Sequence, residues 1–198
     1  MSREAVLTAL RKNLPESAPL PNPADYAEEW IRFDDPVEQF RTTLEAVGGD
    51  LLVVGSREEA DAAIREIPAF VEGEVRVSRV DGVGDTTFDY DALTDPHELA
   101  HVELAVMPAH FAVAENAACW VTCETLCDRV VHFLTQHLAL VVDGPLLHNM
   151  HEAYDRIDPR QSRFSAFISG PSKTADIEQS LVIGAHGSRS LTVVLVQP

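Results

Sequence analysis

The sequence has few cysteines, no long apolar run and no pattern typical of a secretion signal, and each lack argues against a class of protein. It contains 3 cysteines in 198 residues, which does not fit a disulfide-bonded secreted scaffold and suits a reducing cytoplasm. Its N-terminal stretch lacks the apolar core and small-residue cleavage site of a signal peptide. The longest apolar run, Leu138 to Val142, is far too short to span a bilayer. We therefore expect a cytoplasmic protein without a membrane segment.

Positive charge is also scarce. The chain has 15 basic and 32 acidic residues, a net charge of −17. Such a surface repels phosphate backbones and anionic lipids, so we expect neither a nucleic acid nor a membrane as partner. Residues 159–198 are the exception, with 4 basic and 2 acidic residues. This final segment is either a candidate anion-binding region or an ordinary scatter of surface charge.

Proline divides the chain into an N-terminal arm and a larger remainder. Residues 2–14 have the apolar spacing of a short amphipathic helix, with Ser2 as its cap. Four prolines between residues 15 and 23 then predict an extended linker, because proline lacks the N–H group that a helix needs. We expect residues 1–25 to form the arm and residues 26–198 one domain.

Within that domain, short apolar runs alternate with amphipathic segments. Strands are predicted at 51–54, 75–80, 138–142, 164–168 and 191–196, and the stretches 103–106 and 111–122 together predict two or three short strands broken near Pro108 and Asn116. Helices are predicted at 36–47, 56–70, 96–100, 124–134, 145–157 and 174–181. This alternation predicts a three-layer α/β domain with a mostly parallel sheet. In such sheets ligands bind beyond the carboxyl ends of the strands.

The stretch Ile168 to Glu178 reads as a strand, a small-residue turn and the start of a helix. Gly170 permits a sharp turn, and Ser172 or Thr174 can cap the helix. The free N–H groups at such a helix start favour an anion, to which Lys173 would add a full charge. The same pattern also describes a well-capped helix that binds nothing, since acidic residues follow in its first turn.

These residues resemble a known family. Ser169–Glu178, followed by Leu181–Gly187 and Leu191–Val196, is similar to the LUD domain of the lactate-utilisation protein C family. A second segment, Phe111–Val121, resembles the ligand-site segment of that family, in which an acidic residue precedes Thr or Asn and then Gly. Ala117 stands where the family often has the glycine.

The resemblance implies a fold like that of sugar-phosphate isomerases, coenzyme A transferases and folate cyclo-ligases. It implies a small subunit or accessory of an iron–sulfur system that oxidises L-lactate to pyruvate. The iron–sulfur clusters are expected on partner proteins, with no cofactor bound by this chain. Two alternatives stay open: a stand-alone ligase or transferase for a phosphate, coenzyme A or folate substrate, and a non-catalytic assembly subunit that uses the arm as its contact surface.

Two residues are candidate catalytic groups. His186 lies between glycines, and an imidazole titrates near neutral pH. Glu115 is a general base or the cap of a neighbouring turn. The expected ligand is a small carboxylate or phosphate, held at the turn from Gly170 to Thr174 with Lys173 or Arg189 as counter-charge. The candidate ligand-binding residues are Asn116, Gly170, Ser172, Lys173, Thr174, Asp176, Gly184, Gly187 and Arg189.

Two patterns suggest metals at first sight. His97-Glu98-Leu99-Ala100-His101 matches the zinc-binding H-E-x-x-H motif, but Asp95-Pro96 leaves only a short helix and no further ligand is evident. Cys119, Cys123 and Cys127 are spaced four apart, whereas iron–sulfur sites use tighter runs and four cysteines. We therefore predict no metal site and expect buried thiols. The absence of P-loop and G-x-S-x-G motifs excludes the corresponding nucleotide and hydrolase sites.

Overall fold

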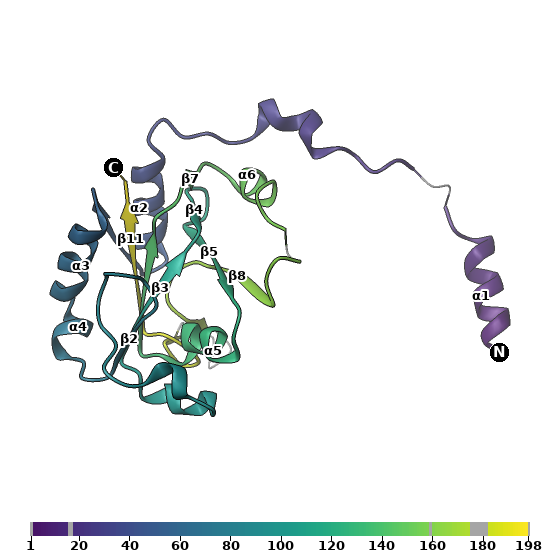
Figure 1. Cartoon of the computed structure of the whole chain (residues 1–198). Coiled ribbons are helices and arrows are strands. Elements are labelled where there is room, and N and C mark those ends of the chain that lie inside the picture. The colour runs from purple at the N-terminus through teal and green to yellow at the C-terminus, as the bar shows by residue number, and fades with distance from the viewer. Residues whose placement is uncertain (1, 16–17, 159, 175–181, 198) are drawn as a thin grey trace. The chain divides into compact units, whose positions relative to one another are not determined.

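The computed structural model describes residues 2–15, 18–158, 160–174 and 182–197. The chain divides into two compact units, Met1–Trp30 and Ile31–Pro198. The first contains helix α1 (Arg3–Lys12) and the 3₁₀ helix η1 (Pro23–Glu29) (Figure 1). Ser2 caps α1 by accepting a hydrogen bond from the Ala5 N–H, as the sequence predicts. Among the described residues, no helix is both long and apolar enough to cross a membrane.

The second unit is built on a five-stranded sheet, sheet A, with the strand order β1-β11-β6-β3-β2. All four neighbouring pairs are parallel, which confirms the predicted α/β architecture. The strands are β1 (Asp50–Val54), β2 (Arg76–Ser78), β3 (Leu104–Ala109), β6 (His137–Val142) and β11 (Ser190–Val196). The break expected near Pro108 falls two residues later, at His110, and β3 runs through Pro108 to Ala109. Because β2 ends opposite Val106, the missing N–H group of Pro108 removes no hydrogen bond to β2.

A second sheet, sheet B, was not predicted as a separate layer. It has the order β7-β4-β5-β8, in which β4 and β7 are parallel and the other pairs antiparallel. The strands are β4 (Phe111–Val113), β5 (Ala118–Cys123), β7 (Leu146–Leu147) and β8 (Phe164–Ile168). The helix predicted from Pro145 is wrong at its start, because Leu146 and Leu147 pair with β4. Helix α6 (Met150–Tyr154) begins later, capped by Asn149.

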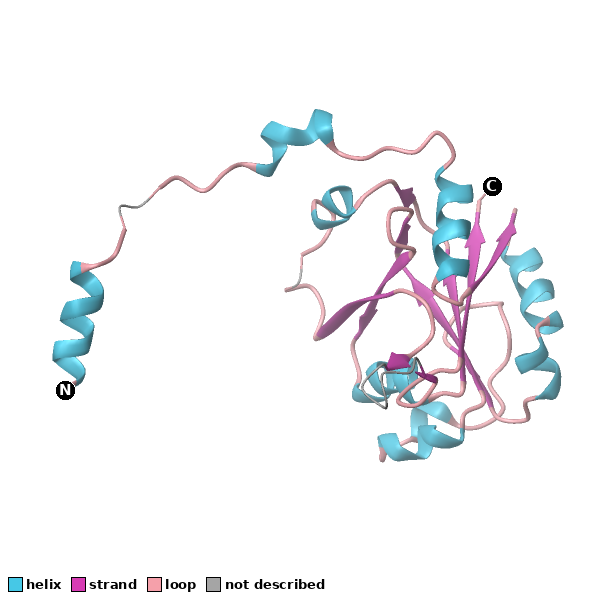
Figure 2. Ribbon diagram, turned by 180° about the vertical axis from the view of Figure 1, so that it is seen from behind, coloured by secondary structure: helices cyan, strands magenta, loops and turns pink. Residues whose placement is uncertain are grey.

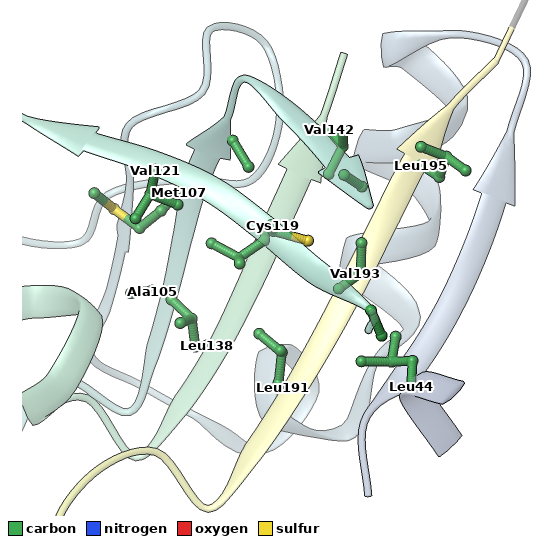
Figure 3. Close-up of a cluster of buried hydrophobic side chains, with 14 of the residues drawn as sticks. Leu44, Ala105, Met107, Cys119, Val121, Leu138, Val142, Leu191, Val193 and Leu195 are labelled. Carbon is green, nitrogen blue, oxygen red and sulfur yellow. The ribbon is translucent and has the colours of Figure 1, made fainter. Parts of the chain in front are cut away.

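Helices and sheet B cover the two faces of sheet A (Figure 2). Helices α3 (Arg57–Glu66) and α4 (Pro68–Glu72) pack on one face. Helices α2 (Pro36–Ala46) and α5 (Leu126–Leu134), with the inner face of sheet B, cover the other. Figure 3 shows Cys119 and Val121 of β5 in this core beside side chains of sheet A. Pro68 divides the single helix predicted at 56–70. The short 3₁₀ helices η2 (Tyr90–Ala92) and η3 (Pro96–His101) precede β3.

The C-terminal helix predicted at 174–181 is wrong at its first residue. Thr174 belongs to a short strand, β9 (Lys173–Thr174), which pairs antiparallel with β10 (Val182–Ile183). Residues 175–181, and with them the candidate Asp176, lie outside the described residues.

Candidate functional site

The two family-like segments meet at the turn between β4 and β5. The Ser169 hydroxyl donates a hydrogen bond of 2.7 Å to the carbonyl oxygen of Asn116. The register of β5 and β8 sets Cys119 opposite Ile168, so the chain after β8 passes this turn. We call residues 115–117 the Glu115 turn.

Glu115 and His148 follow the carboxyl ends of the parallel strands β4 and β7. The Glu115 N–H donates to the His148 carbonyl oxygen over 3.1 Å. Glu115 Oε2 accepts a 2.8 Å hydrogen bond from the Met150 N–H at the start of α6. Its Oε1 accepts no hydrogen bond from the described residues, and the side chain is exposed. Glu115 therefore acts as a cap, and it still presents one carboxylate oxygen at an edge where ligands bind.

His148 is a site residue that the sequence does not single out. Its Nδ1 accepts a hydrogen bond of 3.1 Å from the Phe33 N–H, and its ring stacks on Phe33 with 6.4 Å between centroids. The next residue, Asn149, donates from Nδ2 to the Ile31 carbonyl oxygen over 2.9 Å. The only signal was the apolar pair Leu146-Leu147 just before it, which is too short to predict a strand.

Ala117 has a left-handed backbone conformation. Its φ is +53°, and the residue is fully buried. The Asn116 side chain accepts a hydrogen bond of 3.2 Å from the Ala118 N–H, closing the turn before β5. The position at which the family often has glycine is therefore one where glycine would relieve backbone strain.

The remaining candidates form a second group, which we call the C-terminal loop cluster: Ser172, Lys173, Gly184, Gly187 and Arg189. The Ser172 N–H donates to Ser188 O over 3.0 Å, and the Gly184 N–H donates to Ser172 O over 2.8 Å. A Cβ on Gly187 would lie 2.9 Å from Ser172 Cβ. Only a glycine allows the two segments to approach this closely.

Three positively charged or titratable side chains project from this cluster and its loop. Lys173, His186 and Arg189 are exposed, and none of them forms an ion pair with the residues that the structure describes. Burial lowers the pKa of the neighbouring His137, and the charge of Arg189 lowers it further. The cluster therefore offers two unpaired cations on a chain with a net charge of −17.

The two groups lie at different edges of the sheets. The Arg189 N–H donates to Gln136 O over 2.7 Å, just before β11 and β6 begin, so the cluster lies at the amino ends of sheet A. Figure 1 shows this loop near α5, away from the end of β4. The buried residues Gly170 and Pro171 link the groups. Gly170 has a φ of +74°, and a Cβ there would lie 2.8 Å from Val47 Cγ2.

The patterns that suggested metals do not form a metal site in the described part of the chain. His97 to His101 lie in the 3₁₀ helix η3, where residues four apart do not share a face. No group of three or more potential ligands occurs among the described residues. Burial raises the pKa of Cys119 to about 12 and that of Cys123 to about 11. Three such thiols do not suit an iron–sulfur cluster, which needs four thiolates.

An apolar groove of about 670 Å³ adjoins the C-terminal loop cluster. Phe133 and Leu134 of α5 are exposed in it by 44% and 37%. A Cβ on Gly187 would lie 3.4 Å from the Phe133 carbonyl oxygen, so groove and cluster are neighbours. The lining residues are Pro96, His97, Arg129, Val130, Phe133, Leu134 and Phe164. Exposed apolar side chains gathered in this way are typical of protein contact surfaces.

Comparison with known proteins adds a family and a fold. The LUD domain model matches residues 94–196. The chain is 24% identical to Lactate utilization protein C of Geobacillus thermodenitrificans, covering 98% of this chain and 96% of that one. It is 27% identical to the protein of the same name from an Exiguobacterium species, covering 88% and 83%. A crystal structure of a DUF162 family protein from Deinococcus radiodurans has the same fold, with a TM-score of 0.59, 18% identity and coverage of 84% and 99%.

Proposed function

The chain belongs to the LUD domain family, and from this premise we propose that it takes part in lactate utilisation in the cytoplasm. Its role is that of a small subunit or accessory of an iron–sulfur system that oxidises L-lactate to pyruvate. The iron–sulfur clusters reside on partner proteins. The chain itself binds a small carboxylate at the C-terminal loop cluster. The names of its relatives support the first part of this proposal.

The observation that supports a carboxylate site is that two exposed cations, Lys173 and Arg189, lie on a loop whose backbone is held by hydrogen bonds. Two backbone hydrogen bonds fix Ser172 against Gly184 and Ser188, which holds the backbone directly before Lys173 and directly before Arg189. Charge-assisted hydrogen bonds from Lys or Arg to a carboxylate are stronger than neutral ones. Lactate and pyruvate both carry such a carboxylate. His186, on the same loop, supplies a further group that can donate a hydrogen bond.

The test is calorimetric titration of the full-length protein with L-lactate and with pyruvate. Lys173→Ala and Arg189→Ala should each weaken binding by about tenfold, which corresponds to the loss of one charge-assisted hydrogen bond. Arg163→Ala is the control, because it removes an exposed cation outside the cluster. Unchanged affinity in both cluster variants would exclude this loop as the carboxylate-binding site.

The groove beside the cluster supports the subunit role. Phe133→Glu should abolish capture of cysteine-rich partner proteins from cells grown on L-lactate, because it puts a charge into an exposed apolar surface. Val71→Glu is the matched control, since Val71 is 68% exposed on α4. Lactate-dependent dye reduction by the captured material reports whether the complex is the expected one. Capture that survives Phe133→Glu would exclude the groove as the contact.

A second candidate function is carried by Glu115. Its exposed oxygen at the carboxyl end of β4 suits a general base for a ligase or transferase that uses a phosphate, coenzyme A or folate substrate. Glu115→Gln keeps an oxygen for the Met150 N–H but removes the base. Turnover of such a substrate by the purified protein alone, lost in Glu115→Gln, would favour this function over the subunit role.

The third candidate, a non-catalytic assembly subunit, rests on the N-terminal arm. Helix α1 carries three basic residues and one acidic residue, whereas the whole chain has a net charge of −17. A variant without residues 1–23 should lose its partner if the arm is the contact, with the thermal midpoint of unfolding unchanged. Retained partner binding would exclude the arm.

A further inference from the structure

A second cavity lies on the outer face of sheet B, the face turned away from the main core. Along β4 and β5, Ala112, Cys119 and Val121 face the main core, whereas Phe111 and Trp120 belong to a separate apolar cluster on the other side. The cavity has a volume of about 380 Å³. It contains no residue of the Glu115 turn or of the C-terminal loop cluster.

Its position agrees with the general rule for α/β sheets. His110 follows the carboxyl end of β3, and Pro145 closes the turn after β6, so the cavity lies where two adjacent parallel strands of sheet A end. The turn is tightly constrained, because a Cβ on Gly144 would lie 1.9 Å from the His110 carbonyl oxygen. Only a glycine at this position allows the chain after β6 to approach the His110 backbone this closely, at the edge of the cavity.

One part of the wall is aromatic. The Phe111 and Trp120 rings lie 6.2 Å apart between centroids, with 15° between their planes, and both line the cavity. Phe167 packs on Trp120 from the neighbouring strand, with 4.6 Å between centroids. Two aromatic rings held nearly parallel on a rigid sheet suit contact with another ring, since ring pairs add attraction beyond the burial of area.

The rest of the wall is polar and carries one unpaired cation. His110 Nε2 and Thr122 Oγ1 are 2.7 Å apart. Arg156 lines the cavity, and none of the carboxylates in the described chain forms an ion pair with its guanidinium. Asp158, which also lines it, is bonded to Arg160 over 2.9 Å, and this partner lowers the pKa of Asp158. Glu124 is a further acidic group in the wall, and its charge disfavours a second negative charge, so Arg156 leaves a place for one carboxylate only.

We propose that this cavity binds a small aromatic carboxylic acid as its monoanion. The ring lies against Phe111 and Trp120, the carboxylate pairs with Arg156, and His110 with Thr122 supplies hydrogen bonds. The volume falls in the range of small-molecule sites, about 300 to 1,000 Å³. The strongly negative chain repels anions in general. Saturable binding of a monoanion therefore requires a local cation, which Arg156 provides.

The test uses benzoate and nicotinate as probes, with the neutral benzamide for comparison. The chain has 2 tryptophans, so Trp30→Phe leaves Trp120 as the single indole reporter in the full-length protein. We expect saturable quenching of Trp120 fluorescence by both acids, with benzamide at least about tenfold weaker because it lacks the charge. Calorimetry on the wild-type chain checks the same affinities.

The decisive variant is Arg156→Gln, which removes an exposed cation. It should weaken benzoate binding by about tenfold or more while changing benzamide binding by less than about twofold. Arg156→Lys should recover part of the loss, and Arg163→Gln, outside the cavity, should change neither. No saturable binding of either acid, equal affinity for benzoate and benzamide, or an unchanged benzoate affinity in Arg156→Gln would each overturn the proposal. L-lactate binding stays intact in Arg156→Gln if the C-terminal loop cluster is a separate site.

Discussion

In the Glu115 turn the polar groups hold other parts of the chain, whereas in the C-terminal loop cluster the backbone is held and the cationic side chains are left exposed. Glu115 bonds the start of α6, and the Asn116 carbonyl oxygen accepts from Ser169. Lys173 and Arg189 form no ion pair with the described residues. A group without a structural partner is available to a ligand, and its substitution leaves the fold intact. Function is therefore tested most cleanly in the cluster, whereas the turn needs variants that preserve its hydrogen bonds.

Gly170 links the two regions, and its substitution should have the largest effect on stability. Gly170→Ala should lower the free energy of unfolding by about 2–4 kcal/mol, because it adds a Cβ at positive φ against Val47. That Cβ would lie 2.8 Å from Val47 Cγ2 and 2.9 Å from Val47 O. Denaturant titration measures the loss.

The matched control is Gly82→Ala. Gly82 has a φ of +76°, close to that of Gly170, but a Cβ there would meet nothing within 4 Å. We expect a loss of only about 1 kcal/mol from conformation alone. Equal losses at the two glycines would mean that the contact with Val47 is not what requires Gly170.

Acidification should lower the stability of the protein through a buried histidine on α5, the helix beside the cluster. His132 is 3% exposed, burial lowers its pKa below 6.5, and its Nε2 has no hydrogen-bond partner in the described structure. As the pH drops below 6.5, the unfolded chain binds a proton at His132 more readily than the folded chain does. The free energy of unfolding therefore falls. For one group the slope is at most about 1.4 kcal/mol per pH unit.

Chemical denaturation at several pH values between 8 and 5 measures this slope. His132→Asn keeps a donor for the Asp128 carbonyl oxygen, which His132 Nδ1 contacts at 2.6 Å. The variant should lose less stability between pH 6.5 and 5 than the wild type. His137, whose pKa is also lowered, supplies the slope that remains. An identical slope in the variant would show that His132 is not the group that responds.

Substitution of Glu115 tests whether its hydrogen bond to the start of α6 stabilises the fold. Glu115→Ala should cost about 1 kcal/mol, the usual price of a lost helix cap. Glu115→Gln should cost less than about 0.5 kcal/mol, since its amide oxygen can still accept the Met150 N–H. Lys173→Ala, in the cluster, should also stay within about 0.5 kcal/mol, as for an exposed residue. If Glu115→Ala also changed the free energy of unfolding by less than about 0.5 kcal/mol, the carboxylate would not stabilise the fold.

The parallel sheet could be predicted because its strands carry their own signals. Leu138 to Val142 and Leu191 to Val196 are continuous apolar runs, as expected for strands buried on both faces. The helix starts at Asp35-Pro36 and Ser56 were equally readable, and there Asp35 accepts from the Val37 N–H and Ser56 from the Glu59 N–H. In each case the information lies within a few neighbouring residues.

Sheet B and the separation of the site could not be predicted, since both depend on distant partners. Strands β4 and β7 have three and two residues, too few for a periodic pattern. Their pairing brings His148 beside Glu115, and no local feature encodes that register. The helix start expected at Thr174 differs for a similar reason, because the Thr174 backbone pairs with β10, and residues 175–181 lie outside the described residues.

The smallest expected effect concerns Ala117, where two contributions oppose each other. Replacement by glycine removes the strain of a positive φ, about 1–2 kcal/mol, but loses a buried methyl group and gains chain entropy in the unfolded state, together of similar size. Ala117→Gly should therefore change the free energy of unfolding by less than about 0.5 kcal/mol. Ala112→Gly is the control, since Ala112 is equally buried but lies in the regular strand β4. There no strain is relieved, and a loss of about 1 kcal/mol or more is expected. Equal losses at both positions would mean that the left-handed alanine is not strained, and that the glycine common in the family serves a purpose other than the turn.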